Sequence, residues 1–418
     1  MLRATLVGLV TLLAASASAQ STGPDRPLPG AQTGEAQTGE VQAGLSDSVR
    51  VSLLTMMPGR EAYSLFGHSA LRIRDAAAGL DRTYNFGTFS FDQPFFVARF
   101  LGGSLDYQLA TDPFDLVLYA YQDQGRPIVE QTLDLDARTA RALYDVLETN
   151  ALPENRAYRY DFFWDNCSTR LLGAVDSALA RTGEPPVTLP PVEAALTFRD
   201  LVRPYVRGAP AAHLGTDLAL ALPADAVATA REQTFLPLEL AAQLDRATVG
   251  GRPLVASRDT LFWVPGAGLP APAVPWPTLA GWAVLGVVVF GSVLAGRRAR
   301  DARGLDAVLF GAVGVSGLLM LLLWVATSHT VTGPNVNLLW AWPTHVVAAW
   351  AVLRRRAEPR WQPYFALSAV VTGLTIAFWG VLPQELPLAV MPVAFALALR
   401  SGVRAWPLVA ARRAAHRA

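Results

Sequence analysis

The stretch DNCSTR, residues 165–170, contains the only cysteine among the 418 residues. Apolar residues at helical spacing follow it, so we expect a helix that begins at Cys167 and has Asp165 or Asn166 as its N-cap. A helix N-terminus carries partial positive charge and unpaired N–H groups. These groups stabilise a thiolate and can bind the oxyanion of a tetrahedral intermediate. Cys167 is therefore a candidate nucleophile.

A lone cysteine is also one of the most commonly buried residue types, where it acts as inert packing. Here polar and charged side chains flank Cys167 on both sides, which is a poor apolar environment. The chain offers it no disulfide partner, and an unpaired thiol outside the cytosol is unusual without a chemical use. The flanking residues therefore favour chemistry over packing.

A cysteine nucleophile needs a base, and residues 48–265 contain two histidines. His68 lies in LFGHSALRIRD, residues 65–75, whose alternation predicts a strand. His213 lies in the loop-like segment AAHLG, and we interpret it as a surface residue. A strand histidine that faces a helix-start cysteine is the papain-like arrangement in reversed chain order, so His68 is the expected base of Cys167.

The surrounding segments predict an α+β domain, because a run of strands precedes the helices. The helix expected over residues 137–149 has Asp136 as its N-cap, and a turn is expected near Gly79. Aromatic residues 155–164 suggest an extended approach to the cysteine. The strands are expected over residues 49–57, 65–75, 82–91, 105–111 and 126–135.

The first residues indicate export. Residues 1–19 have one arginine, an apolar core and an A-x-A site at residues 17–19, which together are typical of a cleaved signal peptide. Small polar residues at 20–46 predict a disordered linker. The exported domain is expected over residues 47–270.

The last third of the chain is apolar and predicts a helical membrane domain over residues 276–403. Arginine clusters follow the first, third and fifth predicted spans, so these ends and the Arg-rich tail at 404–418 are expected in the cytoplasm. Five spans then leave the exported domain outside, in agreement with the signal peptide. The spans are expected near residues 277–296, 305–327, 338–353, 364–382 and 386–403.

Composition excludes several classes of function. A formal net charge of +1 gives no indication of nucleic-acid binding, and 52% apolar residues with mean hydropathy +0.28 indicate a membrane protein. The sequence has no lysine, which excludes a Walker A loop, a Schiff-base enzyme and a Ser–Lys hydrolase. His68 and Cys167 lack companions at zinc-ligand spacing, so neither a metal nor a cofactor is expected.

Several motifs together carry a resemblance. FGHSALR and DNCSTR resemble the permuted papain-like fold of lecithin:retinol acyltransferase, in which the histidine strand precedes the cysteine helix. Nearly the whole mature chain is similar to the Lnb family of bacterial lipoprotein N-acyltransferases, which join such a periplasmic domain to a C-terminal membrane domain. The matching stretches are residues 66–72, 84–87, 158–161, 165–170, 197–201, 231–237 and the loop with His329, Asn335 and Asn337.

The resemblance implies Cys167 as nucleophile and His68 as base. Asn85 is the expected third catalytic residue, with Asp161 and Asp165 as competing candidates. The side chain that binds the oxyanion is left open among Arg72, Arg170 and Tyr160. The expected substrate-binding residues are Arg72, Asp165, Asn166, Arg170, His329, Asn335 and Asn337.

The implied reaction moves an acyl chain from a membrane phospholipid, through a thioester on Cys167, to the α-amine of a diacylglyceryl lipoprotein. The enzyme is then expected in the bacterial inner membrane as a multi-pass protein with its catalytic domain in the periplasm. One alternative keeps the nucleophile and is a tethered cysteine hydrolase, either a cell-wall endopeptidase or a thioesterase or phospholipase. A second alternative is a sensor or scaffold whose outer domain only binds lipid or peptide.

Overall fold

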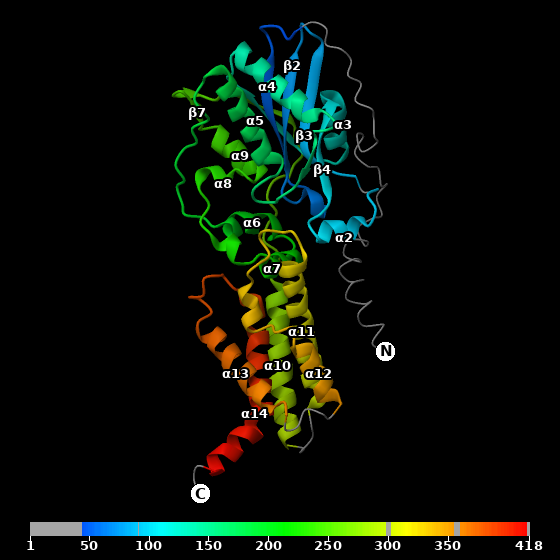
Figure 1. Cartoon of the computed structure of the whole chain (residues 1–418), viewed down its shortest axis with the longest axis vertical. Coiled ribbons are helices and arrows are strands. Elements are labelled where there is room, and N and C mark those ends of the chain that lie inside the picture. The colour runs from blue at the N-terminus through cyan, green and yellow to red at the C-terminus, as the bar shows by residue number, and fades with distance from the viewer. Residues whose placement is uncertain (1–43, 91, 298–301, 355–359, 416–418) are drawn as a thin grey trace.

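The computed structural model describes residues 44–418 except for residues 91, 298–301, 355–359 and 416–418. The expected signal peptide, most of the expected linker and the last three residues of the tail lie outside the described residues. Figure 1 shows two stacked parts, a sheet domain built from the first part of the chain and a helical bundle built from the last.

The sheet domain is built on one antiparallel seven-stranded sheet of order β6-β4-β3-β2-β1-β5-β9. All five predicted strands are present, and the α+β prediction is confirmed for this domain. β6, within the predicted extended approach to the cysteine, and β9 complete the edges. The strands are β1 Arg50–Met56, β2 His68–Asp75, β3 Leu80–Thr88, β4 Asp106–Pro113, β5 Ile128–Leu133, β6 Ala157–Arg159 and β9 Val255–Phe262, with a separate ribbon of β7 Thr248–Val249 and β8 Arg252–Pro253.

Helices cover both faces of this sheet. Successive strand residues point to opposite faces, so neighbours in sequence pack against different helices. Leu53 and Leu71 pack with helices α4 Ala137–Ala151 and α5 Cys167–Thr182. Leu54 and Ala70, their neighbours in sequence, pack with α3 Phe114–Asp123 on the other face. The sheet is therefore a buried central layer that fixes where each strand residue points.

A second group of helices lies between the sheet and the bundle (Figure 1). His213 belongs to one of them, α7, so the loop predicted there is wrong. Pro210 opens this helix with a preset φ, and His213 lies 3.5 Å from the Asp217 carboxylate one turn later. The remaining elements of the sheet domain are η1 Ala62–Ser64, α2 Phe96–Leu101, α6 Phe198–Val206, α7 Pro210–Ala219, η2 Leu222–Asp225, α8 Ala230–Gln233 and α9 Pro237–Leu244.

The described part of the bundle has five α-helices, and not all of them are long enough to cross a membrane. Three helices have the length and apolar composition for a span, over Trp276–Arg297, Arg303–Ala326 and Leu388–Trp406. The spans expected at 338–353 and 364–382 are instead a nine-residue helix and a sixteen-residue helix. The elements are α10 Trp276–Arg297, α11 Arg303–Ala326, η3 Val336–Leu339, α12 His345–Leu353, α13 Gln362–Ala377, η4 Leu388–Val390 and α14 Met391–Ala415.

Glycines of α11 explain why the third predicted span is short. A Cβ on Gly317 would lie 1.9 Å from the Ala341 carbonyl oxygen, and one on Gly314 would lie 2.4 Å from the Val346 nitrogen. The backbone at Ala341, before α12, and at Val346, in its first turn, therefore packs directly against α11, and helical geometry begins only at His345. An apolar run in the sequence does not reveal this contact.

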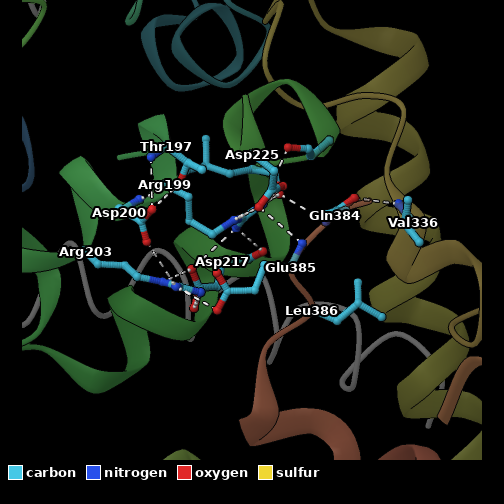
Figure 2. Close-up of polar contacts among 12 residues, drawn as sticks. Thr197, Arg199, Asp200, Arg203, Asp217, Asp225, Val336, Gln384, Glu385 and Leu386 are labelled. Atoms are coloured by element: carbon cyan, nitrogen blue, oxygen red, sulfur yellow. Dashed lines mark hydrogen bonds and ion pairs between the residues drawn. The ribbon is translucent and has the colours of Figure 1, made fainter. Parts of the chain in front are cut away.

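Charged side chains join the two parts of the molecule (Figure 2). Arg199 of α6 is fully buried, and its guanidinium donates to both carboxylate oxygens of Asp225 at 2.8 and 2.9 Å and to Asp217. Arg203, one turn later, pairs with Asp217 and reaches Glu385 at 2.8 Å. Glu385 lies between α13 and α14, so this network connects the sheet domain to the bundle.

Candidate active site

Cys167 is the first residue of α5, because Asn166 caps that helix. The Asn166 side-chain oxygen accepts from the N–H groups of Ser168 and Thr169 at 2.8 and 3.0 Å. Its side-chain nitrogen donates to two main-chain carbonyls, at 2.7 and 2.9 Å. Asn166 is only 2% exposed. The predicted N-cap is confirmed. The Asn166 side chain was also predicted to bind substrate, but its oxygen and nitrogen are both already hydrogen-bonded to main-chain groups.

The Cys167 thiol is buried, with 7% exposure. The backbone N–H of Ser69 donates to the sulfur, and the Ser168 hydroxyl lies 4.0 Å from it. The Ser69 and Ser168 hydroxyls are 3.1 Å apart and fix the start of α5 against β2. Burial raises the pKa of the Cys167 thiol, because desolvation of a thiolate outweighs these N–H and O–H donors. The resting group is a thiol, in contrast to the thiolate expected from the helix N-terminus alone.

His68 is the first residue of β2, directly after Gly67, whose φ of +78° turns the chain into the strand. Desolvation and the charge of Arg126 together lower the pKa of His68 to about 4, against the opposing effect of a hydrogen bond with Asn85. Asn85 also hydrogen-bonds Asp112, whose pKa is raised by burial. His68 is therefore a neutral imidazole at pH 7, with the Asn85 amide beside it.

The other two candidates for the third catalytic residue make different contacts. Asp161 accepts from two main-chain N–H groups with one oxygen and from the Thr330 hydroxyl at 2.6 Å with the other. Asp165 forms a two-pronged ion pair with Arg170 at 2.5 and 2.7 Å. Of the three candidates, Asn85 is the one that contacts the His68 ring.

Ser69 connects His68 to Cys167, because it follows His68 in the chain and its backbone N–H donates to the Cys167 sulfur. Across the described part of the chain, no hydrogen bond links the imidazole directly to the sulfur. Strand alternation places the His68 side chain on the α3 face and the Ser69 side chain on the α5 face. His68 is the first residue of β2, so it lies at one end of the central strand of the sheet.

Tyrosines surround the sulfur on its other side. Gly87 has φ +85°, and a Cβ there would lie 3.3 Å from the Tyr160 ring, 3.6 Å from the Cys167 Cβ and 3.7 Å from the Tyr158 hydroxyl. That hydroxyl is buried and has no hydrogen-bond partner among the described residues. The Arg170 guanidinium stacks on the Tyr158 ring at 3.5 Å. Gly87 itself hints at this close approach, since glycine inside a strand often marks a bulge or a tight contact.

The predicted substrate-binding residue Arg72 lies away from the sulfur. Its guanidinium pairs with Asp81 and Glu130 and lies 3.4 Å over the Phe114 ring on the α3 face. These contacts give Arg72 a structural role in joining three strands to α3.

The loop after α11 contacts the sheet domain beside the candidate site. The His329 ring lies 3.1 Å from the Leu101 carbonyl oxygen. Asn335 donates to the Leu218 carbonyl at 2.7 Å and accepts from Asn337, and both asparagines are buried. The asparagines therefore hold this loop against α7, and His329 is the member of the predicted trio nearest to solvent.

Two cavities flank the tyrosines. One of about 350 Å³ is lined in part by Phe86, Asp165 and Arg170, and one of about 370 Å³ lies between residues 104–106 and 157–159. Neither of them is lined by the sulfur or the imidazole. Within the described ranges, no group of three histidine, cysteine or acidic side chains could hold a metal ion.

Comparison with protein families gives two matches, which leave residues 197–270 between them. Residues 42–196 match the Lnb N-terminal periplasmic domain, and residues 271–411 match the Lnb transmembrane domain. The first match contains Cys167, His68 and Asn85. No curated protein and no solved structure matches the chain.

Proposed function

Since the chain belongs to the Lnb family, with its N-terminal domain in the periplasm and its C-terminal helices in the membrane, we propose that it is a lipoprotein N-acyltransferase. The acyl donor is a membrane phospholipid, and the acceptor is the α-amine of a diacylglyceryl-cysteine at a lipoprotein N-terminus. The observation that carries the proposal is the placement of Cys167 at the start of α5, beside Ser69, with Asp161 earlier in the same segment bonded to Thr330 of the loop that leaves α11.

In the first half-reaction, Cys167 is the nucleophile and His68 is the general base. The thiol is protonated and the imidazole is neutral at rest, so proton transfer to His68 accompanies attack of the sulfur on the ester carbonyl. A sulfur–carbon bond forms, the ester carbon–oxygen bond breaks, and the leaving lysophospholipid oxygen takes the proton from His68.

Backbone N–H groups at the start of α5 stabilise the oxyanion. Asn166 already holds the N–H groups of Ser168 and Thr169, so the remaining first-turn donor is the N–H of Cys167 itself. The Ser69 N–H, which points at the sulfur, lies on the same side. Two converging N–H donors are the usual composition of such a site.

In the second half-reaction, the lipoprotein amine attacks the thioester carbonyl. A nitrogen–carbon bond forms, the carbon–sulfur bond breaks, and His68 carries the amine proton to the departing sulfur. Asn85 holds the imidazole ring during both transfers. Burial of the sulfur supports transfer over hydrolysis, because water has little access to the thioester.

The test is the product formed in membranes supplied with a diacyl lipoprotein. We expect one additional acyl mass on the lipoprotein N-terminus, and its loss in Cys167→Ala. Free fatty acid without that added mass would identify a cysteine hydrolase instead. A Cys167→Ala variant with unchanged cellular phenotype and unchanged lipoprotein mass would favour a sensor or scaffold.

A further inference from the structure

The short helix α2 and the residue before it expose large apolar side chains. Phe95 is 84% exposed, Phe100 is 46% exposed and Leu101 is 56% exposed. Phe95 also has φ +57°, the single positive φ outside glycine in the described part of the chain. An aromatic residue in that backbone region is strained, and exposing its ring to water is costly as well. Both costs indicate an apolar partner for this segment.

The location of α2 identifies the partner as lipid. Gly102, which ends the helix, accepts a 2.9 Å hydrogen bond from the N–H of Ser328, and the His329 ring lies 3.1 Å from the Leu101 carbonyl oxygen. Ser328 is two residues beyond Ala326, the last residue of membrane-spanning α11. The end of α2 is therefore held at the membrane face of the sheet domain (Figure 1).

Aromatic rings connect this exposed segment to the candidate nucleophile. Consecutive ring centroids along the row are 6.1, 5.8, 5.4 and 4.4 Å apart. The last ring, Tyr160, is also the ring that meets Cys167 across Gly87. The row consists of Phe100, Phe96, Phe89, Tyr107 and Tyr160.

We propose that Phe95, Phe100 and Leu101 insert into the periplasmic leaflet and that the acyl chain of the phospholipid donor passes along the aromatic row to Cys167. This inference rests on the proposed acyltransferase function, and it names the route by which a buried sulfur meets a lipid substrate. An aromatic row suits an acyl chain because its ring faces offer a continuous apolar surface.

Exposed apolar side chains on α3 supply a matched control. Leu116 is 45% exposed and Tyr119 is 61% exposed, one turn apart on the same helix. Figure 1 shows α3 beside the sheet and away from the bundle. The same kind of residue therefore occurs at a site that a bilayer does not reach.

Depth in the membrane can be measured without reference to activity. The full chain carrying Cys167→Ala has no cysteine, so Phe100→Cys or Tyr119→Cys then provides a single labelling site for an environment-sensitive fluorophore. In phospholipid nanodiscs, we expect doxyl-labelled lipid to quench the fluorophore at position 100 severalfold more than the one at position 119, and iodide to show the reverse order. Iodide quenching at position 100 equal to that at position 119 would overturn the proposal.

An activity measurement tests the route. With vesicles of long-chain phospholipid, the double variant Phe100→Ser with Leu101→Ser is expected to acylate Cys167 at least about tenfold more slowly. The reason is that each substitution removes an apolar side chain that would be buried in the bilayer, which weakens membrane contact. With a soluble short-chain ester the same variant should lose less of its rate than it loses with vesicles, because that donor does not have to leave a bilayer, and Leu116→Ser with Tyr119→Ser should match the unmodified protein on both donors. Unchanged acylation from vesicles would overturn the route. Absence of a thioester from every donor would instead refute the acyltransferase function, while the quenching result would still decide whether α2 enters lipid.

Discussion

At the scale of single residues, the candidate pair combines a thiol that resists ionisation with an imidazole that resists protonation. Burial raises the pKa of Cys167 and lowers that of His68 to about 4. A resting thiolate–imidazolium pair is therefore disfavoured, and in the proposed mechanism the proton moves as the sulfur attacks the substrate carbonyl. Such a site protects an unpaired periplasmic thiol from oxidation, because the thiolate is the reactive form.

These directions predict the pH dependence of acylation. With a folded-state pKa of about 4, below the ordinary value of 6.5, His68 stays a neutral base through mildly acidic pH. We expect the acid limb of kcat/KM for thioester formation near pH 4 and not near 6.5. The same depressed pKa stabilises the fold fully above pH 6.5, and that contribution is lost as pH falls from 6.5 through 4. Intact-protein mass spectrometry of Cys167 acylation between pH 4 and 8 provides the profile.

Alkylation by iodoacetamide is the companion measurement. Its rate at pH 7 is expected to be slower than that of a free peptide thiol, because the pKa of Cys167 is raised. Rapid alkylation at pH 7, or an acid limb at pH 6.5, would contradict the neutral-pair description.

The sequence located these two residues but not their surroundings. Asn85 could be proposed because it lies on the strand next to His68, and strand pairing is a local feature. Arg126 comes from a distant segment, and only the folded sheet brings it beside His68. Residue types at such long sequence separations carry no local signal.

At the scale of elements, the bulge in β3 allows α5 to approach the sheet. The register between β3 and β4 shifts between Asn85 and Thr88, and Gly87 lies within that shift. Its missing side chain leaves the space in which Tyr160 and Cys167 meet. Gly87 therefore meets two requirements, a backbone with positive φ and the absence of a side chain between Tyr160 and Cys167.

Two glycine variants separate these requirements. Gly79→Ala places a methyl group at φ +65° with no atom within 4 Å, and Gly87→Ala places one at φ +85° against Tyr160 and Cys167. Each is expected to cost about 1–2 kcal/mol of stability from backbone strain. Only Gly87→Ala should also slow Cys167 acylation, by about tenfold or more, since a shift of this size at the sulfur misplaces the nucleophile. Thermal unfolding and thioester formation measured on both variants test this, and equal acylation by the two would refute it.

Elements were predictable where one local pattern determined them. Alternation identified the strand of His68, and Asn166 with the apolar spacing after it identified α5. The lengths of α12 and α13 were not predictable, because an apolar run looks the same whether it forms a helix or packs irregularly against Gly314 and Gly317. The helix α2 was also missed, since its exposed phenylalanines show no amphipathic period over six residues.

At the scale of the whole molecule, polar contacts fix the sheet domain to the bundle on two sides. One side is the loop after α11, where Thr330 bonds Asp161 and Ser328 bonds Gly102. The other side is the network of Arg199, which reaches the connection between α13 and α14. Two separated attachments resist tilting of the sheet domain on the bundle better than one.

The last prediction concerns the Arg199 network. Arg199→Met leaves the buried carboxylate of Asp225 without its cation and removes one of the two arginines paired with Asp217, and breaking a buried ion pair typically costs about 3–5 kcal/mol. Glu385→Gln removes only an exposed partner of Arg203 and should cost about 0–1 kcal/mol. In thermal unfolding of the full chain in nanodiscs, the first variant is expected to lower Tm by on the order of 10 °C and the second by little. The ion pair between Arg203 and Asp217 remains in both variants. Equal Tm shifts for the two variants would therefore contradict the stabilising role assigned to the buried Arg199.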